Sequence, residues 1–513
     1  MTSAGICMII TIAVYLIGML LIGAALTKQN KNSDDFYLGG RKLGPLVTAM
    51  SAEASDMSSW LLMGLPGLAL MTGLAEATWT AIGLAIGTYV NWLFVAKRIR
   101  VYSNKINAIT LPEFFSKRFG DKANILTVIS AVFIVVFFVP YTASGFSACG
   151  KLFASLFGTD YVTAMVISAA IIVLYCTLGG FLAASTTDFV QSIVMTVALF
   201  VVIGFGEGAV HGFDNVFANV RGLDGFLNLF EGFSVEKNEI MSYGALPVVS
   251  TLAWGLGYFG MPHILLRFMA IEDENKLKLS RRIASVWVVI SMAVAVLIGV
   301  VGYSLMKEGI VPAYADASAA ETIIVDIANV ISKLGYVPAV VAGIILSGIL
   351  ASTMSTADSQ LLAAASSISQ DLVQRAFKVK LSAKASMILA RISVIVISVV
   401  AVFLALDPKS SVFKIVSFAW AGFGATFGPI MLFALFWKRT NKWGALAGML
   451  SGGAMIFFWK FVIRDVFAGT WLDIYELLPA FILASILIVV VSLITSAPEK
   501  EICDDFDAVK ASI

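Results

Sequence analysis

Histidine, cysteine and charged side chains are all scarce in this sequence of 513 residues. It holds two histidines, His211 and His263, and four cysteines, with no CxxC pair and no His/Cys spacing of a metal site. No GxxxxGK(S/T) run is present to bind a nucleotide phosphate. The sequence therefore gives no basis for a zinc hydrolase, for an ATP-driven pump within this chain or for an intramembrane enzyme. We expect neither catalysis nor an organic cofactor.

Charged residues make up only 13% of the chain and hydrophobic residues 59%, whereas soluble domains have about 25% charged residues. A formal net charge of +2 with no basic face gives no indication of a nucleic-acid partner. Apolar runs of about 20 residues, enough to cross a lipid bilayer as helices, recur throughout. We predict an all-α integral membrane protein, with residues 1–496 as one transmembrane domain and 497–513 as a short tail. The thirteen expected spans lie near residues 4–26, 44–71, 75–95, 125–156, 161–180, 189–208, 241–261, 283–306, 337–369, 386–406, 412–437, 444–461 and 474–496.

The distribution of Lys and Arg predicts the orientation of these spans, because positive residues are retained in the cytoplasm. With the N-terminus outside, the cytoplasmic segments hold 25 of the 35 Lys and Arg residues and the opposite side nine. Lys28, Lys31 and Arg267 are among the 25. We therefore expect a multi-pass protein of the plasma membrane with the N-terminus outside and the C-terminus in the cytoplasm.

Two of the expected spans are interrupted by residues that disfavour a continuous apolar helix. Residues 51–59 (SAEASDMSS) carry two carboxylates and four hydroxyls, and residues 255–262 (GLGYFGMP) combine three glycines with a proline. In lipid, unwound backbone is tolerated only where it faces protein or a polar cavity. The two breaks lie five spans apart, so they cross in opposite directions. This predicts an inverted repeat of five helices, over about 44–208 and 241–437, with a binding site at the midplane.

Asp56 is the most informative single residue in the first break. A carboxylate at the centre of a span costs on the order of 3 kcal/mol on insertion scales, and such residues usually mark an ion or substrate path. The alternative is a carboxylate that only holds two helices together. Glu53, one turn earlier, is a weaker candidate for the same path.

A row of hydroxyls lies in the ninth expected span. Positions 352, 355, 356 and 359 follow helical spacing, so their four hydroxyls share one face. A hard cation such as Na⁺ prefers oxygen ligands, both hydroxyls and the carbonyls freed at a helix break. This face could therefore complete a cation site begun near Asp56. Hydroxyls that only join helices in the membrane are the alternative.

Two other features allow a more local interpretation. Asp188 follows a Gly179-Gly180 connection and can cap the sixth span, because a helix N-terminus favours an anion. Residues 209–240 mix aromatic and charged side chains on the outer side and suggest a short amphipathic element.

Several motifs together resemble the sodium/solute symporter family, and within it the bacterial sodium/proline symporters. The similarity runs from residues 36–41 (FYLGGR) to the last spans. Its landmarks are residues 54–58 (ASDMS), 60–67 (WLLMGLPG), 179–183 (GGFLA), 254–263 (WGLGYFGMPH), 354–356 (MST) and 419–428 (AWAGFGATFG).

This resemblance implies a LeuT-like core of two inverted five-helix repeats, with one helix before it and two after it. It implies sodium as the coupling ion, and it assigns roles to specific positions. The implied sodium site comprises the carbonyls of Ala54 and Met57 and the side chains of Ser352, Ser355 and Thr356, with Asp56 as the nearby carboxylate. The implied substrate region comprises Ser58, Tyr141, Trp254, Tyr258 and Pro262. Relatives that bind a second sodium suggest a further cation site at Asp188, Asp358 and Ser359.

The sequence departs from the proline carriers at Glu53 and Ser59, where they have glycine, and at Asp358, which adds a third carboxylate. The expected function is sodium-coupled uptake of a small amphoteric solute, with L-proline as the expected solute, by alternating access. Other solutes of the family, namely sialic acid, pantothenate, a sugar or another amino acid, remain open. A channel or a sensor derived from a transporter is the more distant alternative. The oligomeric state is left open.

Overall fold

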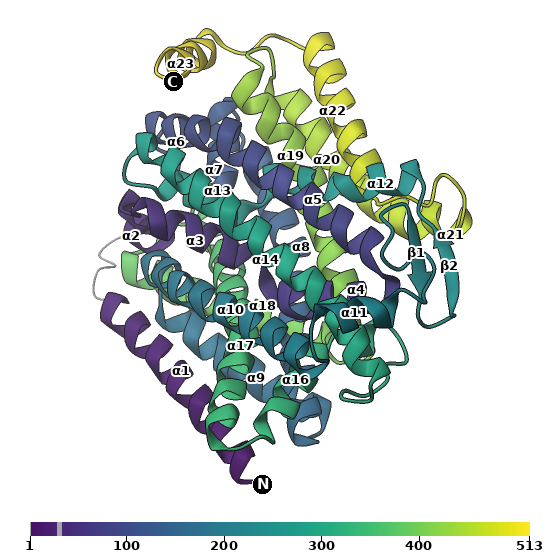
Figure 1. The fold of residues 1–513 in the computed structure, drawn as a ribbon. Helices are drawn as coiled ribbons and strands as arrows, with labels where there is room; N and C mark the ends of the chain where they lie inside the picture. Colours follow the sequence, from purple (N-terminus) through teal and green to yellow (C-terminus); the bar gives the residue numbers. More distant parts are fainter. Residues whose placement is uncertain (1, 28–32) are drawn as a thin grey trace.

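The computed structural model describes residues 2–27 and 33–513, so the positive residues Lys28 and Lys31 lie outside the described part. The chain forms a bundle of helices with its two termini at opposite ends (Figure 1). Among the described residues, ten helices are long and apolar enough to cross a membrane. Their bounds are Ser3–Thr27, Leu74–Lys105, Ile125–Phe157, Phe181–Ala209, Glu274–Lys307, Tyr336–Ala376, Lys384–Leu404, Val412–Phe436, Lys442–Val466 and Leu477–Ile494.

Three further segments account for the remaining predicted spans. Two are the interrupted ones, and the third is the shorter helix α9, Tyr161–Leu178. The second span consists of α3 (Pro45–Asp56), a π-helical turn η2 (Trp60–Gly64) and α4 (Leu65–Thr72). The seventh consists of α12 (Ala245–Leu252), a 3₁₀ segment η4 (Ala253–Gly260) and α13 (Pro262–Ala270). The prediction of about thirteen membrane-crossing segments therefore agrees with the fold.

The first break follows directly from the end of α3. The helix stops at Asp56, and Met57 leaves helical geometry with φ −73° and ψ 15° while its N–H still bonds the Glu53 carbonyl at 2.9 Å. Ser58 and Ser59 are helical again and the π-helical turn η2 begins at Trp60, so the regular α-helical ladder is interrupted at Met57. Carbonyls at such an interruption lack their regular helical donors. Those carbonyls are then free for side chains or ions.

The second break is tighter and depends on glycine. A Cβ atom at Gly255 would lie 2.2 Å from the carbonyl oxygen of Gly83, so only glycine allows η4 to approach α5 (Leu74–Val90) this closely. Pro262 then opens α13, where the absent N–H of proline costs no helical bond. The apolar part of the seventh segment ends at Gly260, next to the predicted end at residue 261, and α13 continues the segment to Ala270.

Helices α17 (Tyr336–Ser366) and α19 (Val412–Phe436) lie at the centre of the bundle. Within their apolar windows 72% and 83% of residues are buried, against 22% in α1 (Ser3–Thr27), which lies at the edge. Apolar side chains on peripheral helices such as α1 therefore face the surroundings, as lipid requires.

The segment after the sixth span holds a helix, α11 (Phe213–Val220), and a two-stranded antiparallel hairpin, β1 (Glu231–Ser234) with β2 (Glu239–Ser242). The helix matches the expected amphipathic element, whereas the hairpin is an exception to the all-α prediction. Strands this short give no clear period-two pattern. Two short helices, α15 (Ala317–Ala320) and α16 (Ile323–Ser332), also precede α17 without having been predicted.

The remaining elements connect or extend the spans. The tail, predicted only as polar, contains the helix α23, whose Phe506 packs against Arg118 of α7 at 5.1 Å. The bounds are α2 Ser33–Leu38, η1 Gly39–Arg41, η3 Asn91–Val95, α6 Ala96–Lys105, α7 Leu111–Arg118, α8 Ile125–Phe157, α10 Phe181–Ala209, η5 Glu274–Lys276, α14 Leu277–Lys307, η6 Ser367–Ala376, α18 Ala383–Leu404, α20 Lys442–Phe458, η7 Trp459–Ile463, α21 Arg464–Val466, α22 Leu477–Ile494 and α23 Lys500–Ala511.

Candidate cation and solute site

The break in α3 touches the hydroxyl face of α17. The Ser355 hydroxyl donates to the Ala54 carbonyl at 2.8 Å, although the two residues are 301 positions apart. Ser352, Ser355 and Thr356 are all buried, and the Thr356 hydroxyl has no hydrogen-bond partner among the described residues. Hydroxyl and carbonyl oxygens from two helices therefore converge where the backbone unwinds, which is the ligand chemistry of a hard monovalent cation.

Asp56 lies at the same break and faces the protein interior. Its Oδ2 accepts a hydrogen bond from the Tyr258 hydroxyl at 2.6 Å, and its backbone carbonyl accepts one from the Tyr141 hydroxyl at 3.1 Å. The residue is only 6% exposed. Tyrosines from η4 and α8 are thus bonded to one residue of α3, so three elements are held together at this point.

A small cavity of about 10 Å³, space for about one water molecule, lies beside Asp56. Its wall is largely aromatic, and Trp254 packs against Trp60 at 5.8 Å and against Trp420 at 6.4 Å between ring centroids. The Trp420 indole donates to the Trp254 carbonyl at 2.7 Å, which fixes both rings. The cavity is lined by Asp56, Met57, Trp60, Leu84, Tyr141, Trp254, Val416 and Trp420. The chemistry of this wall suits an apolar ring with a polar group at one end, and the space must widen before such a solute fits.

Trp60 and Trp420 are part of the motifs quoted above, but no site role was predicted for either residue. Trp420 packs directly on the second break, because a Cβ atom at Gly257 would lie 2.0 Å from its indole nitrogen. The glycine of the second break therefore exists in part to admit this ring. That pairing joins residues 163 positions apart and is not legible from local sequence.

The other residues expected to bind the substrate lie at different places around the site. Ser58 and Tyr141 line a second small cavity with Thr356, and the Ser58 hydroxyl accepts from the Trp60 N–H at 3.2 Å. Tyr258 reaches the site through its bond to Asp56. Pro262 is buried at the start of α13 and lines neither cavity, so its place in the structure is to set the backbone after the break.

A wider vestibule of about 710 Å³ leads to this site from one end of the bundle. Trp254 lines both the vestibule and the small cavity. The Phe413 ring lies 5.5 Å from that of Trp254 and 6.2 Å from that of Trp60. These three rings form a thin aromatic layer between the vestibule and the enclosed cavity.

The residues expected to form a second cation site gather around an arginine instead. Arg267 of α13 donates to Asp188 Oδ2 at 3.0 Å and to the Ser359 hydroxyl at 2.5 Å. The sequence had placed Arg267 in a cytoplasmic connection, but its side chain is 1% exposed. The interpretation of Asp188 as a helix cap was also wrong, since α10 begins at Phe181, two turns earlier. Both errors have one cause: the partners of a buried charge come from distant spans.

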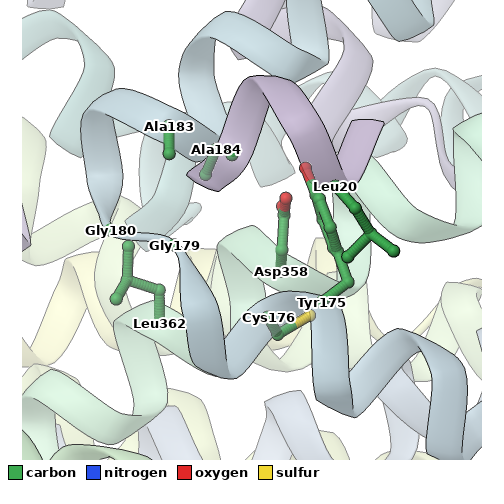
Figure 2. Close-up of a pocket in the computed structure, with 10 residues that line it drawn as sticks. Leu20, Tyr175, Cys176, Gly179, Gly180, Ala183, Ala184, Asp358 and Leu362 are labelled. Carbon is green, nitrogen blue, oxygen red and sulfur yellow. The ribbon is translucent and has the colours of Figure 1, made fainter. Parts of the chain in front are cut away.

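Asp358 is linked to this arginine through the Ser359 hydroxyl, and its carboxylate faces a separate cavity. Its Oδ1 accepts from the Ser359 hydroxyl at 3.2 Å, and its Oδ2 has no hydrogen-bond partner among the described residues. Figure 2 shows its carboxylate pointing into the cavity between Tyr175 and the Gly179-Gly180 connection. The three residues expected together are therefore connected: Asp188 and Ser359 bond the arginine, and Asp358 bonds Ser359 at the edge of the cavity.

Glu53 is buried near the break but makes a different contact. Its Oε1 accepts a hydrogen bond from the Trp92 indole at 2.8 Å, while Oε2 has no partner among the described residues. This bond ties α3 to η3 rather than to α17.

The architecture and the site define a class, that of LeuT-like transporters that move a solute together with a cation. A solved structure of a Na⁺-coupled sialic acid symporter aligns over 96% of this chain and 99% of its own with a TM-score of 0.76 at 17% identity. The structure of MhsT in complex with L-phenylalanine aligns over 88% and 98% with a TM-score of 0.54 at 14% identity. At these identities the likeness concerns the fold.

Sequence comparison gives the particular family. The sodium:solute symporter family matches residues 36–452, and the chain belongs to that family. It is 42% identical to the sodium/proline symporter of Escherichia coli over 96% of this chain and 94% of the relative. It is 44% identical to that of Haemophilus influenzae over 97% of both, and 43% identical to the osmoregulated proline transporter OpuE of Bacillus subtilis over 96% of both. The predicted family is therefore confirmed, and with it a transporter rather than an enzyme.

Proposed function

We propose that this protein carries L-proline into the cell together with sodium by alternating access. The observation that carries the proposal is the contact of the Ser355 hydroxyl with the Ala54 carbonyl, at a helix break that also holds Asp56. The names of the relatives, sodium/proline symporters among them, support proline as the solute.

The coupling ion is Na⁺, which binds between α3 and α17. Its ligands are the carbonyls of Ala54 and Met57 and the hydroxyls of Ser352, Ser355 and Thr356. Asp56 supplies the negative charge that compensates the ion. The burial of all these groups supports the assignment, because desolvated oxygens bind a bare cation more strongly than hydrated ones.

Proline binds against the aromatic wall next to Asp56, where the small cavity widens to admit it. Trp254 and Tyr141 pack against the apolar ring, while Ser58, Tyr258 and the backbone around Pro262 define its polar end. Coupling follows from shared contacts, since Asp56 bonds both Tyr258 and Tyr141. Sodium that orders the break at Asp56 therefore also orders the side chains that contact the solute. By thermodynamic linkage, bound proline raises the affinity for sodium by the same factor by which sodium raises the affinity for proline.

The protein lies in the plasma membrane with its N-terminus outside and its C-terminus in the cytoplasm. The vestibule above Trp254 then opens outward, and the arginine cluster lies on the cytoplasmic side of the break. The membrane-spanning part, 1–496, is one domain with repeats over about 44–208 and 241–437, followed by a cytoplasmic tail over 497–513. Asp188, Asp358 and Ser359 mark a second position where a cation is expected. At this position Arg267 donates hydrogen bonds to Asp188 and Ser359.

The test is uptake of labelled proline into proteoliposomes with sodium varied and with sialic acid, pantothenate, sugars and other amino acids as competitors. Asp56→Asn abolishes sodium-stimulated uptake, whereas the exposed helix cap Asp316→Asn leaves it intact. Normal sodium affinity in Asp56→Asn contradicts the ion site. Uptake of another solute in place of proline contradicts only the assignment of proline as the substrate.

A further inference from the structure

The second small cavity at the break is lined by a buried amide whose donor is unused. Gln360 of α17 lines this cavity and is 0% exposed. Its Oε1 accepts a hydrogen bond from the Thr142 hydroxyl of α8 at 3.3 Å, whereas its Nε2 has no partner among the described residues. A buried donor that stays unpaired is unfavourable. The amide therefore has two hydrogens to offer to an acceptor.

We propose that Gln360 donates hydrogen bonds from Nε2 to the carboxylate of the bound solute and thereby makes the transporter select solutes with a free carboxylate. The inference rests on the proposed function and deepens it, because it names the chemical group that is recognised at the polar end of the solute. Gln360 was not among the residues predicted to bind the solute, although it lies one helical turn beyond Thr356.

The place of Gln360 relative to the aromatic wall suits this role. Tyr141 lines both small cavities, so the wall next to Asp56 and the cavity of Gln360 adjoin at this residue. A ring packed against the wall can therefore direct its carboxylate toward Gln360. The second cavity measures about 10 Å³, space for about one water molecule, so it must widen together with the first.

The charge of the lining favours a carboxylate that is held by neutral donors. Neither small cavity is lined by a Lys, Arg or His side chain within the described part of the chain. A buried carboxylate is unfavourable unless it is hydrogen-bonded, and its two oxygens accept about four hydrogen bonds. The hydroxyls of Ser58 and Thr356 line the same cavity and add to the two hydrogens of the Gln360 amide.

Thr356 connects this contact to the ion. Its hydroxyl oxygen is a proposed sodium ligand, and the hydroxyl has no hydrogen-bond partner among the described residues. A hydroxyl that coordinates a cation through its oxygen can still donate its hydrogen. Thr356 can therefore contact both the ion and the carboxylate, whereas Gln360 contacts the carboxylate alone. Loss of Gln360 should for this reason weaken solute binding without weakening sodium binding.

The deciding experiment compares L-proline with L-prolinamide, in which a neutral amide replaces the carboxylate, as competitors of labelled proline on purified protein in nanodiscs. The wild type prefers proline. Gln360→Met removes the donor at similar side-chain length, so it weakens proline binding about tenfold or more, the loss expected for a hydrogen bond to a charged group, and leaves prolinamide little changed. Gln360→Glu keeps an acceptor for Thr142 but places a negative charge against the carboxylate, so it shifts the preference toward prolinamide.

Gln191→Met is the matched control. Gln191 of α10 is also 0% exposed, but its Nε2 donates to the Tyr15 hydroxyl at 3.2 Å, so this variant should keep the preference of the wild type. Binding of radioactive sodium without solute is measured on each preparation. It should equal that of the wild type in every variant, which also shows that each variant is folded.

Equal affinity of the wild type for proline and prolinamide overturns the inference, and this reading does not depend on any variant folding. An equal loss of both competitors in Gln360→Met also overturns it, because the residue would then have a structural role only. So does an unchanged preference for proline in that variant. Absence of sodium-dependent proline binding in the wild type instead contradicts the proposed function, so the two failures are distinguishable.

Discussion

Two polar clusters join α3 to α17, and they differ in how they meet the need for positive charge. Around Ala54 and Ser355 the groups are oxygens with one carboxylate, and no basic side chain bonds to them among the described residues. Around Asp188 and Ser359 the same kinds of oxygen bond a guanidinium. A cluster that lacks a fixed cation can bind and release an ion. A cluster that contains its own cation instead holds the helices together permanently. The comparison separates an ion site from a structural contact made of similar residues.

The largest effect is expected in the first cluster, from Ser355→Ala. Loss of the hydroxyl that reaches the Ala54 carbonyl removes one ion ligand, so the sodium concentration for half-maximal uptake rises at least about tenfold, the lower end of losses seen when metal-site groups are removed. Uptake measured across a sodium titration checks this. Ser347→Ala is the control, because the Ser347 hydroxyl bonds only the Gly343 carbonyl of its own helix. Equal sodium dependence in the two variants would remove Ser355 from the ion site.

Tyr258→Phe should have the next largest effect. A hydrogen bond to a charged group contributes about 1.5–3 kcal/mol, so its loss at Asp56 weakens binding by roughly tenfold or more. Because Tyr258 joins the ion and solute regions, we expect proline affinity and its dependence on sodium to fall together, as followed by equilibrium binding of labelled proline. Tyr161→Phe removes a bond to the Ala405 carbonyl instead and should leave both unchanged. A loss of proline affinity with normal sodium dependence would show that Tyr258 does not couple them.

Ser51→Ala probes the second cluster with the same chemical change as Ser355→Ala. Its hydroxyl bridges Arg267 and Asp188, so we expect the free energy of unfolding to fall by about 1 kcal/mol. Sodium affinity should stay within about twofold, because Arg267 remains as the cation. Thermal melting and sodium-dependent uptake of one preparation provide both values. A sodium defect as large as that of Ser355→Ala would erase the distinction between the clusters.

The smallest effect is expected from Glu53→Gln. The amide oxygen can still accept the Trp92 indole hydrogen, and Glu53 makes no bond to α17 among the described contacts. We expect sodium affinity to change by less than about twofold, in contrast with Asp56→Asn one turn away. A sodium titration of uptake in each of these two variants tests the contrast. Equal losses would place Glu53 among the ion-binding groups.

The spans and the two breaks were predictable because hydropathy and helix-breaking residues are local properties of a sequence. The hydroxyl face of α17 was equally visible from helical spacing. The burial of Arg267 was not predictable, because a charged residue at the end of an apolar run is normally placed at the membrane surface unless its partner is known. Asp188 lies 79 positions away and carried its own local interpretation as a cap. The aromatic wall around Trp420 was missed for the same reason, because it is assembled from separate spans.

The most direct test of the central claim is proline binding to purified protein with and without sodium. The wild type should bind proline more tightly as sodium rises, saturating as a single ion binds. Ser355→Ala should shift that dependence to higher sodium, while Ser51→Ala should follow the wild type. Identical sodium dependence in all three proteins would contradict the assignment of the ion to the break between α3 and α17.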